Sequence, residues 1–428
     1  MSLEPGRLDM ARHRAQRPVR VLEPAEAWRV ERLIETLYAG AWADAPPDRP
    51  LGAMALVGDV DEAAALLAEP DVFVKDYDLL TVLGHSRFDA RGEEWAARRD
   101  LTQPVLRAAA VTDRHPAIAK AYADRFAAVD QAEGLDRAIL AAASDVLLSA
   151  FGATVPGEEV ADWLLSFRPL ARRVQIAGMF GGHQAGLAAL RADIAAARDV
   201  IDGVLTADPA LMAWCAWADA RMAARPAAVG RPGFDAATEL VLALLAGTET
   251  TAASLAWAVR MLAADPVLQA RLVEAAARDG GRAPEIAVFT QEVMRYFPPV
   301  PVLTRRVIGG DRVLAGRPVR EGTLLALDVI RLHHDRRWWD RPRQFRADRA
   351  EFAERTYHRR AFLPFSAGAR VCGGTGLARA EVHWALAALL QRFRIQTGAG
   401  APGVMQFEYA LTMRPQGLSD LALEPRHG

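Results

Sequence analysis

Residues 365–374 read Phe-Ser-Ala-Gly-Ala-Arg-Val-Cys-Gly-Gly and stand directly before a run with helical spacing. Three glycines, Gly368, Gly373 and Gly374, allow sharp turns and a close approach of the backbone to a flat ligand. Cys372 precedes the expected helix, where free N–H groups and the positive end of the helix dipole favour a thiolate. A zinc cage usually needs four ligands, whereas one axial thiolate is what a haem iron needs to favour O–O cleavage. The stretch therefore predicts a thiolate metal ligand on a glycine-rich turn.

The same decapeptide resembles the haem loop of the cytochromes P-450, the haem-thiolate monooxygenases. Five fixed positions of that loop are matched, by Phe365, Gly368, Arg370, Cys372 and Gly374. The resemblance implies that Cys372 is the axial ligand of a haem b iron and that the other four residues belong to the haem-binding site. The alternative is a glycine-rich turn that carries a buried structural cysteine.

Length and composition bound the fold. The chain has 428 residues, of which 51% are hydrophobic, which is ample for a large core. Length alone suggests two or three domains. The resemblance instead implies one mainly α unit, a large helical fold with small β-sheets in which haem lies between a long central helix and the Cys372 loop. We expect an N-terminal arm over residues 1–24 and a single haem-thiolate monooxygenase domain over residues 25–428.

Charge and cysteine content exclude several classes of protein. The net charge of −1 argues against nucleic acid as a partner. The N-terminus is polar and basic, without the apolar segment of a signal peptide or membrane anchor, so we expect a cytoplasmic protein that does not associate with membranes. Two cysteines do not suggest a disulfide framework, and Cys215 is expected to be a packed small side chain. The scarcity of lysine beside arginine and alanine favours a bacterial source, and we expect a soluble monomer.

The longest helix is predicted over residues 235–266. Asp235 is the expected N-cap, and Pro266 ends the run. About 29 residues at ~1.5 Å each give roughly 43 Å, which is enough to cross a whole domain.

The middle of this helix is unusual for a buried element. Residues 246–251 read Ala-Gly-Thr-Glu-Thr-Thr, and a glycine, threonines and an acid are poor choices there. The Thr250 hydroxyl can turn back to the carbonyl of Ala246, and such a local violation usually marks a functional site. The cytochromes P-450 have an acid–alcohol pair here, which implies that Glu249 and Thr250 are catalytic and relay protons to dioxygen, with Ala246 and Gly247 beside the cofactor. The alternative is a helix kink with a solvated glutamate.

Trp95 and Arg99 form a second pair of interest. They are four residues apart and project from one helical face. An indole N–H and a guanidinium together suit an anionic oxygen group. The family has W-x-x-x-R here in contact with a haem propionate, which implies that both residues bind the cofactor. The alternative is a partly buried tryptophan beside a surface arginine.

Glu292 and Arg295 form an E-x-x-R pair on one face of a helix that ends at Pro298. In the family this pair makes a buried ion network with an arginine of a later loop, which implies that Arg349 is the third member. The family usually has proline where Ala347 stands, so the match around Arg349 is incomplete.

The remaining elements are predicted from apolar spacing and turn residues. Short apolar runs and glycine turns over residues 300–328 indicate a small sheet. There Arg305 falls where the family often has a second propionate-binding arginine, with Arg306 as the alternative. We also expect helices over residues 25–38, 60–68 and several within 116–225, a strand within 52–60, a loop over 73–91 and a hairpin over 407–413.

A substrate pocket is expected near the haem. The candidate lining residues are apolar and favour a small, largely hydrophobic substrate: Leu79, Leu80, Leu83, Leu242, Ala246, Val300, Val302 and Leu411.

The function implied by the resemblance is the insertion of one oxygen atom from O2 into such a substrate, by hydroxylation or epoxidation. The sequence contains no flavin or iron–sulfur motif, so electrons are expected from NAD(P)H through a separate ferredoxin or flavodoxin with its reductase. Three alternatives are a peroxide-driven haem enzyme, a non-catalytic haem-binding protein and a helical scaffold without haem. A docking face for the redox partner could be formed by Arg98, Arg99, Arg107, Arg359 and Arg360.

Overall fold

The computed structural model describes residues 30–43, 54–129, 134–179, 187–225, 233–397 and 406–426. The arm expected over residues 1–24 lies outside this part of the chain. The helices are α2 (Val30–Ala43), α3 (Val60–Ala68), α4 (Asp78–Thr81), α5 (Gly92–Ala109), α6 (His115–Ala127), α7 (Leu135–Ala150), α8 (Gly157–Met179), α10 (Arg191–Thr206), α11 (Pro209–Ala223), α12 (Ala236–Ala264), α13 (Pro266–Arg278), α14 (Pro284–Tyr296), α15 (Val329–His333), α16 (Ala350–Ala353) and α17 (Thr375–Arg392).

The strands form one four-stranded sheet and three two-stranded ones. In the larger sheet the order is β1 (Met54–Val57), β6 (Leu324–Asp328), β3 (Val302–Val307) and β2 (Phe73–Lys75), with only β1 and β6 parallel. The small sheets pair β4 (Arg312–Leu314) with β5 (Arg317–Val319), β7 (Phe393–Thr397) with β10 (Leu421–Pro425), and β8 (Phe407–Tyr409) with β9 (Met413–Pro415). A mainly α fold with small sheets is therefore confirmed.

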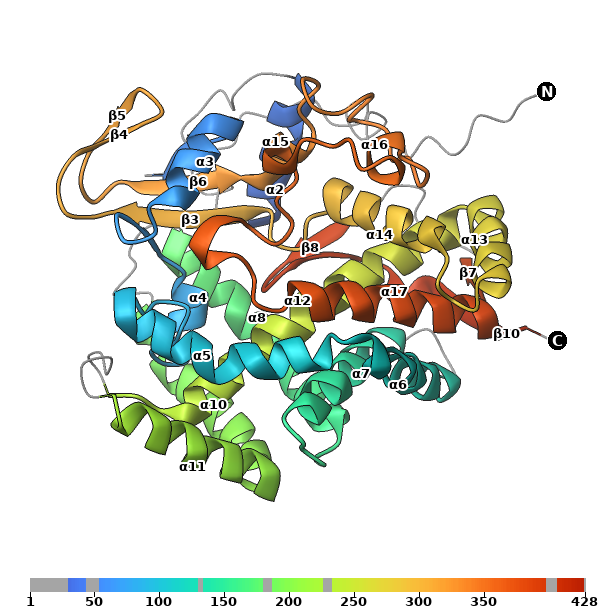
Figure 1. Ribbon diagram of the computed structural model, residues 1–428, viewed down its shortest axis with the longest axis horizontal. Helices are drawn as coiled ribbons and strands as arrows, with labels where there is room; N and C mark the ends of the chain where they lie inside the picture. Colours follow the sequence, from blue (N-terminus) through green and yellow to red (C-terminus); the bar gives the residue numbers. More distant parts are fainter. Residues whose placement is uncertain are drawn as a thin grey trace.

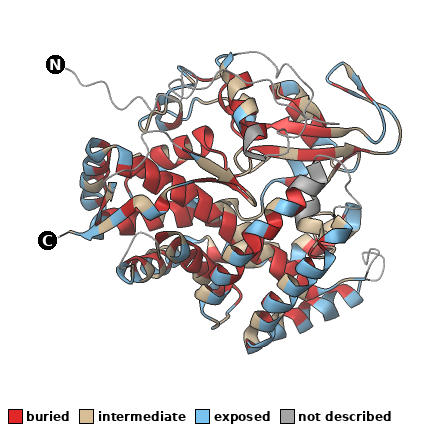
Figure 2. Cartoon of the chain, turned by 180° about the vertical axis from the view of Figure 1, so that it is seen from behind, coloured by how far each residue is buried: buried red, intermediate tan, exposed pale blue. Residues whose placement is uncertain are grey.

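The long helix α12 lies at the centre of the molecule (Figure 1). It begins after Asp235, whose side chain accepts a hydrogen bond from the Ala237 amide, and it ends just before Pro266. By length and composition it is the one helix in the described ranges that could cross a membrane, but 78% of its apolar window is buried inside the protein. Figure 2 shows that buried residues gather in the central helices and exposed residues on the outer ones. We therefore interpret α12 as the core helix.

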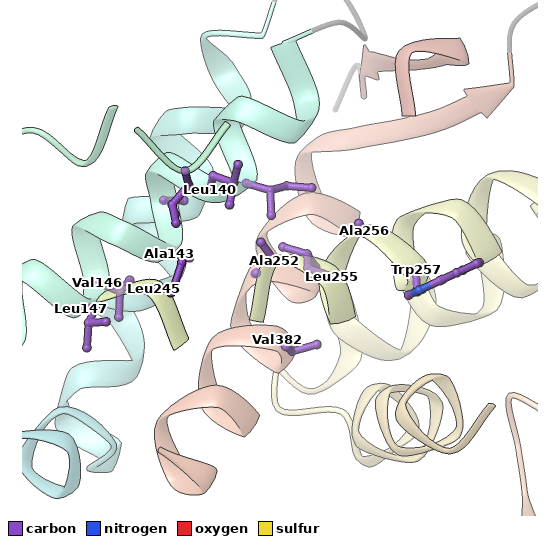
Figure 3. Close-up of a cluster of buried hydrophobic side chains, with 14 of the residues drawn as sticks. Leu140, Ala143, Val146, Leu147, Leu245, Ala252, Leu255, Ala256, Trp257 and Val382 are labelled. Carbon is purple, nitrogen blue, oxygen red and sulfur yellow. The ribbon is translucent and has the colours of Figure 1, made fainter. Parts of the chain in front are cut away.

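The apolar core joins α12 to its neighbours. Leu147 and Val146 of α7 face Leu245 of α12, while Leu255 of α12 lies on the side of Val382 in α17 (Figure 3). Burial of large aliphatic side chains at about 1.5–3 kcal/mol each holds these helices together. This packing leaves the middle of α12 beside the loop that contains Cys372.

Residues 73–91 differ from the loop predicted for them. They include strand β2 and the short helix α4. Strand β2 pairs with β3, and Lys75 stands opposite Arg305 in that register. A three-residue strand depends on a partner far along the chain, so local sequence carries little signal for it.

Candidate active site

A cavity of about 490 Å³ lies between the middle of α12 and the Cys372 loop. Its walls also include α5, α17, β3 and the β8–β9 hairpin. The predicted site residues that line it are Trp95, Arg99, Ala246, Gly247, Glu249, Thr250, Phe365, Arg370, Cys372 and Gly374, together with the apolar Leu80, Val300, Val302 and Leu411.

Other predicted site residues lie elsewhere. Leu83 and Leu242 are buried in the core and do not line the cavity, and the side chain of Leu79 lies outside the described part of the chain. Leu242 precedes Thr250 by eight positions, which is about 80° around the helix, whereas Ala243 precedes it by seven, which is about 20°. Ala243 lines the cavity accordingly. The placement of Leu242 in the pocket was wrong, and helical phase would have given the right neighbour.

The Cys372 loop takes its shape from its glycines. Gly368 has a φ of 70°, and a Cβ there would lie 2.5 Å from the carbonyl oxygen of Leu67, so a larger residue does not fit. The Cys372 amide donates to the carbonyl of Phe365 at 2.9 Å. A Cβ at Gly374 would lie 3.9 Å from the Cys372 Sγ. The loop thus presents an exposed thiol to the cavity, directly before α17.

One end of the cavity gathers cationic side chains around Trp95. The guanidinium carbons of Arg99 and Arg370 lie 4.9 and 4.4 Å from the centre of the Trp95 ring. Arg370 also donates to the carbonyl of Ala90 at 2.6 Å. Burial, opposed by the more distant Asp71, lowers the pKa of Arg370 to about 10.

Two further cations at this end, Lys75 and Arg87, were missed by the sequence analysis. Burial lowers the pKa of Lys75 to about 7, with further lowering by Arg305, Arg370 and Arg87. A Cβ at Gly373 would lie 2.8 Å from Nη2 of Arg87. Within the described residues, none of the side chains of Lys75, Arg87, Arg305 and Arg370 forms an ion pair with a carboxylate. A ligand that carries carboxylates would supply the missing negative charge.

The choice between Arg305 and Arg306 can now be argued from their partners. Arg306 lies at the cavity edge and pairs with Asp76 at 2.5 Å. Arg305 is 2% exposed, does not line the cavity itself, and contacts the Tyr77 hydroxyl at 3.4 Å. Because Arg306 is already neutralised, Arg305 is the better candidate for an anionic ligand.

The centre of α12 has the predicted local distortion. The Thr250 hydroxyl donates to the carbonyl of Ala246 at 2.8 Å. A Cβ at Gly247 would lie 2.8 Å from Cδ2 of Leu147, so glycine allows α7 to approach closely. Thr250 thus lines the cavity while its hydroxyl proton is held by its own helix.

Glu249 is not solvated, so the alternative of a kink with a solvated glutamate was wrong. Its carboxylate is buried and accepts hydrogen bonds from Arg168 at 2.9 Å and from Arg414 at 3.3 Å. Both arginines also contact Asp136, which is partly exposed. Burial raises the pKa of Glu249, and Arg168 opposes this shift. The network therefore links a cavity carboxylate to the molecular surface.

Arg168 and Arg414, the partners of Glu249, come from α8 and β9, and Asp136, which pairs with both of them, comes from α7; all are far from Glu249 in sequence. No local pattern pointed to Arg168, Arg414 or Asp136. Arginines are common throughout this chain. The presence of an arginine at positions 168 and 414 therefore gave no indication that these two residues belong to the site.

The E-x-x-R pair and the later arginine meet in one buried network. Glu292 accepts hydrogen bonds from Arg295 at 2.7 and 2.8 Å and from Arg349 at 2.6 and 3.0 Å. All three side chains have 0% exposure. Arg295 also donates to the carbonyls of His333 and Pro342, so the network ties α14 to the end of α15 and to the loop that follows it.

Burial settles two other predictions. Cys215 is buried, which raises the pKa of its thiol to about 11, as expected for a packed side chain. Arg98 is also buried and pairs with Glu94 and Glu239, so it does not belong to an exposed docking face.

Glu381 of α17 is a further acid in the cavity wall that the sequence analysis missed. It is buried and accepts a hydrogen bond from the Tyr122 hydroxyl at 3.3 Å. Burial raises the pKa of this carboxyl from 4.5 to about 8. A carboxyl with this pKa is mostly protonated at pH 7 in the folded protein.

Replacing Glu381 by glutamine should flatten the dependence of thermal stability on pH. A raised folded pKa contributes stability that is present below the unfolded pKa of 4.5 and is lost as pH rises to about 8. The largest slope is about 1.4 kcal/mol per pH unit. We expect the Tm of Glu381→Gln, measured relative to the Tm of wild type, to increase as pH rises from 4.5 to about 8. The exposed Glu274→Gln is the control; equal Tm curves for wild type and Glu381→Gln would contradict the assignment.

Comparisons with known proteins agree with this geometry. The family profile described as cytochrome P-450 matches residues 235–419. Cytochrome P-450 132 of Mycobacterium tuberculosis is 30% identical over 189 residues, covering 42% of this chain and 40% of that protein. The steroid 17-alpha-hydroxylase/17,20 lyase of Oryzias latipes is 34% identical over 164 residues, covering 35% of this chain and 32% of the relative. These matches span two fifths or less of the relatives' length.

Solved structures resemble the chain over most of its length. A six-coordinate cytochrome P-450 from Thermus thermophilus superposes with a TM-score of 0.65 at 22% identity, covering 93% of this chain and 99% of that one. The heme domain of cytochrome P-450DA superposes with a TM-score of 0.63 at 21% identity, covering 87% and 86%. At these identities the likeness shows the fold.

Proposed function

Since residues 235–419 belong to the cytochrome P-450 family and the chain has the fold of these proteins, we propose that it is a haem-thiolate monooxygenase. It inserts one oxygen atom from O2 into a small, largely hydrophobic substrate, by hydroxylation or epoxidation. Electrons come from NAD(P)H through a separate ferredoxin or flavodoxin with its reductase. Residues 25–428 act as one unit, in a soluble, monomeric bacterial protein of the cytoplasm.

The observation that carries this proposal is the Cys372 thiol in a cavity wall opposite the distorted centre of α12. Two features fit haem in particular. Gly374 leaves the space beside the sulfur open, and the cations Lys75 and Arg305 have no carboxylate partner in the described chain, which suits propionates. When bound, haem would supply the dioxygen chemistry, and Cys372 would hold it through a thiolate.

The residues of the chain have distinct roles in this proposal. Cys372 would bind the haem iron as a thiolate. The propionates would be held by a polar and cationic group of residues: Trp95, Arg99, Arg305, Arg370 and Lys75. The apolar wall excludes water and positions the substrate through Leu80, Val300, Val302 and Leu411.

Proton delivery is assigned to the acid–alcohol pair. Glu249 faces the cavity from a network that reaches the partly exposed Asp136 through two arginines. Thr250 holds its hydroxyl proton on the Ala246 carbonyl, so its oxygen can accept a hydrogen bond from a water in the cavity. That water can then be oriented toward dioxygen. A peroxide-driven enzyme or a non-catalytic haem protein would not need this arrangement.

The proposal is tested by the spectrum of the reduced, carbon-monoxide-bound protein. A red-shifted Soret band requires a thiolate ligand. Its absence would rule out a haem-thiolate enzyme, and with it the family mechanism. Because some curated relatives are steroid hydroxylases, steroids are a sensible first class in a screen for compounds that shift the iron from low to high spin.

Replacing Thr250 by alanine should uncouple electron consumption from product formation. The change removes one hydroxyl and little volume, so folding and substrate binding should persist, while proton delivery becomes disordered. Proton-transfer contributions of this kind are worth about 10²–10⁴-fold, although substitute water could reduce the loss. The measurement is product formed per NAD(P)H consumed, with hydrogen peroxide assayed in parallel.

Thr251→Ala is the matched control, because Thr251 is the next threonine and also lines the cavity. Its coupling should stay near that of wild type. If Thr250→Ala kept the coupling of wild type, the assignment of the proton relay to Thr250 would be wrong. The relay would then be assigned to Thr251, to Glu249 alone or to a hydroxyl of the substrate.

A further inference from the structure

Gln175 is an unexplained polar side chain in the cavity wall. It lies in α8, is 9% exposed and lines the cavity. Its amide oxygen Oε1 is buried and has no hydrogen-bond donor among the side chains and backbone groups that the structure describes. A buried acceptor without a donor is costly to a folded protein. Such a group in a cavity wall is therefore available to a ligand.

The other half of the Gln175 amide is already used. The amide makes a hydrogen bond with the hydroxyl of Tyr409 in β8, and this bond acts to lower the pKa of that hydroxyl. Tyr409 is buried, and burial together with the nearby Tyr77 raises its pKa well above the usual range, so it stays a neutral phenol. With the NH2 group of Gln175 directed to Tyr409, the oxygen Oε1 is left without a donor among the described residues.

The residues around Gln175 determine which kind of ligand group can donate a hydrogen bond to its oxygen Oε1. Much of the cavity wall is apolar, including Leu80, Ala243 and Leu411. A carboxylate would be repelled by an amide oxygen, and Arg99 and Arg370 are placed at Trp95. An uncharged O–H or N–H group satisfies the oxygen without bringing a charge into an apolar wall.

We propose that Gln175 binds a hydroxyl or N–H group of the substrate and thereby sets which carbon is oxidised. The inference rests on the proposed monooxygenase function and names the substrate class: an apolar molecule with one uncharged hydrogen-bond donor. Gln175 lines the cavity from α8, and Cys372 lines it from the loop before α17. A substrate held at Gln175 therefore presents another part of its skeleton to the oxidising centre, with Tyr409 as the positioning residue.

The experiment uses matched ligands on the haem-loaded protein. Three alcohols and their parent hydrocarbons are titrated by the spin-state shift: 4-cyclohexylcyclohexanol with bicyclohexyl, borneol with bornane, and decanol with decane. The ketones of the first two alcohols carry an acceptor in place of the donor. In at least one series we expect wild type to bind the alcohol about tenfold more tightly than the hydrocarbon and the ketone, as one buried hydrogen bond predicts.

Gln175→Leu and Gln175→Met should remove this preference while leaving hydrocarbon binding unchanged or tighter. Tyr409→Phe leaves the oxygen in place but frees the amide to rotate, so it should weaken the preference only in part. If no series shows an alcohol preference, if the variants keep it, or if a ketone is preferred, the proposal is wrong.

A second measurement separates recognition from a structural role. If Gln175 serves the ligand, the ligand-free Gln175→Met protein should have a Tm equal to or above that of wild type, because an unsatisfied buried acceptor has been removed. A clear fall in Tm would instead mean that the pair with Tyr409 is structural. The carbon monoxide spectrum of each variant is recorded alongside. A normal thiolate band with no alcohol preference defeats only this inference, whereas a missing band in wild type defeats the proposed function.

Discussion

Replacing Cys372 by histidine is expected to abolish both the red-shifted Soret band of the reduced, carbon-monoxide-bound protein and all oxygenase activity. The thiol is exposed to the cavity on a loop whose shape depends on Gly368, which has a positive φ and no room for a Cβ. Imidazole is a neutral ligand and does not push electron density onto iron as a thiolate does. The loss of activity should be essentially complete, while the protein remains folded.

The matched control is Cys215→Ala, which changes the other cysteine of the chain. Cys215 is buried in α11 and should have no influence on the spectrum. A Cys372→Ala protein that kept the full thiolate spectrum would refute the assignment of Cys372 as the ligand.

Breaking the Glu292 network should leave little folded, haem-loaded protein. Arg295 and Arg349 each make two hydrogen bonds to the Glu292 carboxylate, and all three side chains are fully buried. Removing one partner strands the others as buried charges, at a cost of about 3–5 kcal/mol. We expect Glu292→Ala, Arg295→Ala and Arg349→Ala to show low soluble yield, low haem content per chain and a lowered Tm.

The control is the exposed ion pair between Arg137 and Asp162, which has the same two-bond geometry, with distances of 2.6 and 2.8 Å. Exposed pairs contribute about 0–1 kcal/mol, so Arg137→Ala should express and bind haem like wild type. A soluble Glu292→Ala protein with normal haem content and Tm would show that the network is dispensable. This result would also count against Arg349 as the third member of the family's ion network. The match there is already incomplete, because Ala347 stands where the family usually has proline.

Local physical chemistry explains what could be predicted from the sequence. The span of α12 follows from a side-chain cap at Asp235 and from Pro266 after its end. The bond from Thr250 to Ala246 joins residues four apart on one helix, and Trp95 with Arg99 has the same spacing. In each case the interacting groups are within one helical turn, so the chain itself brings them together.

Errors arose where local signals were weak or misapplied. The loop prediction over residues 73–91 misses strand β2, because a three-residue strand exists only through its pairing with β3. The prediction that Leu242 lines the pocket ignores the helical phase set by Thr250, which favours Ala243. The second of these errors could have been avoided from the sequence, whereas the first could not.

The sequence by itself determined the thiolate loop, the central helix with its acid–alcohol pair and the identity of the E-x-x-R residues, because these depend on spacing and backbone geometry within short segments. Only the tertiary structure decided which charges are neutralised and which are not. Glu249 is held by Arg168 and Arg414 from distant elements, and Lys75 meets Arg305 through sheet register. Gln175 likewise is left with a free oxygen only because β8 brings Tyr409 to its other side. The energy of a buried polar group depends on every neighbour that folding places around it, and that set of neighbours is not encoded in any one stretch of sequence.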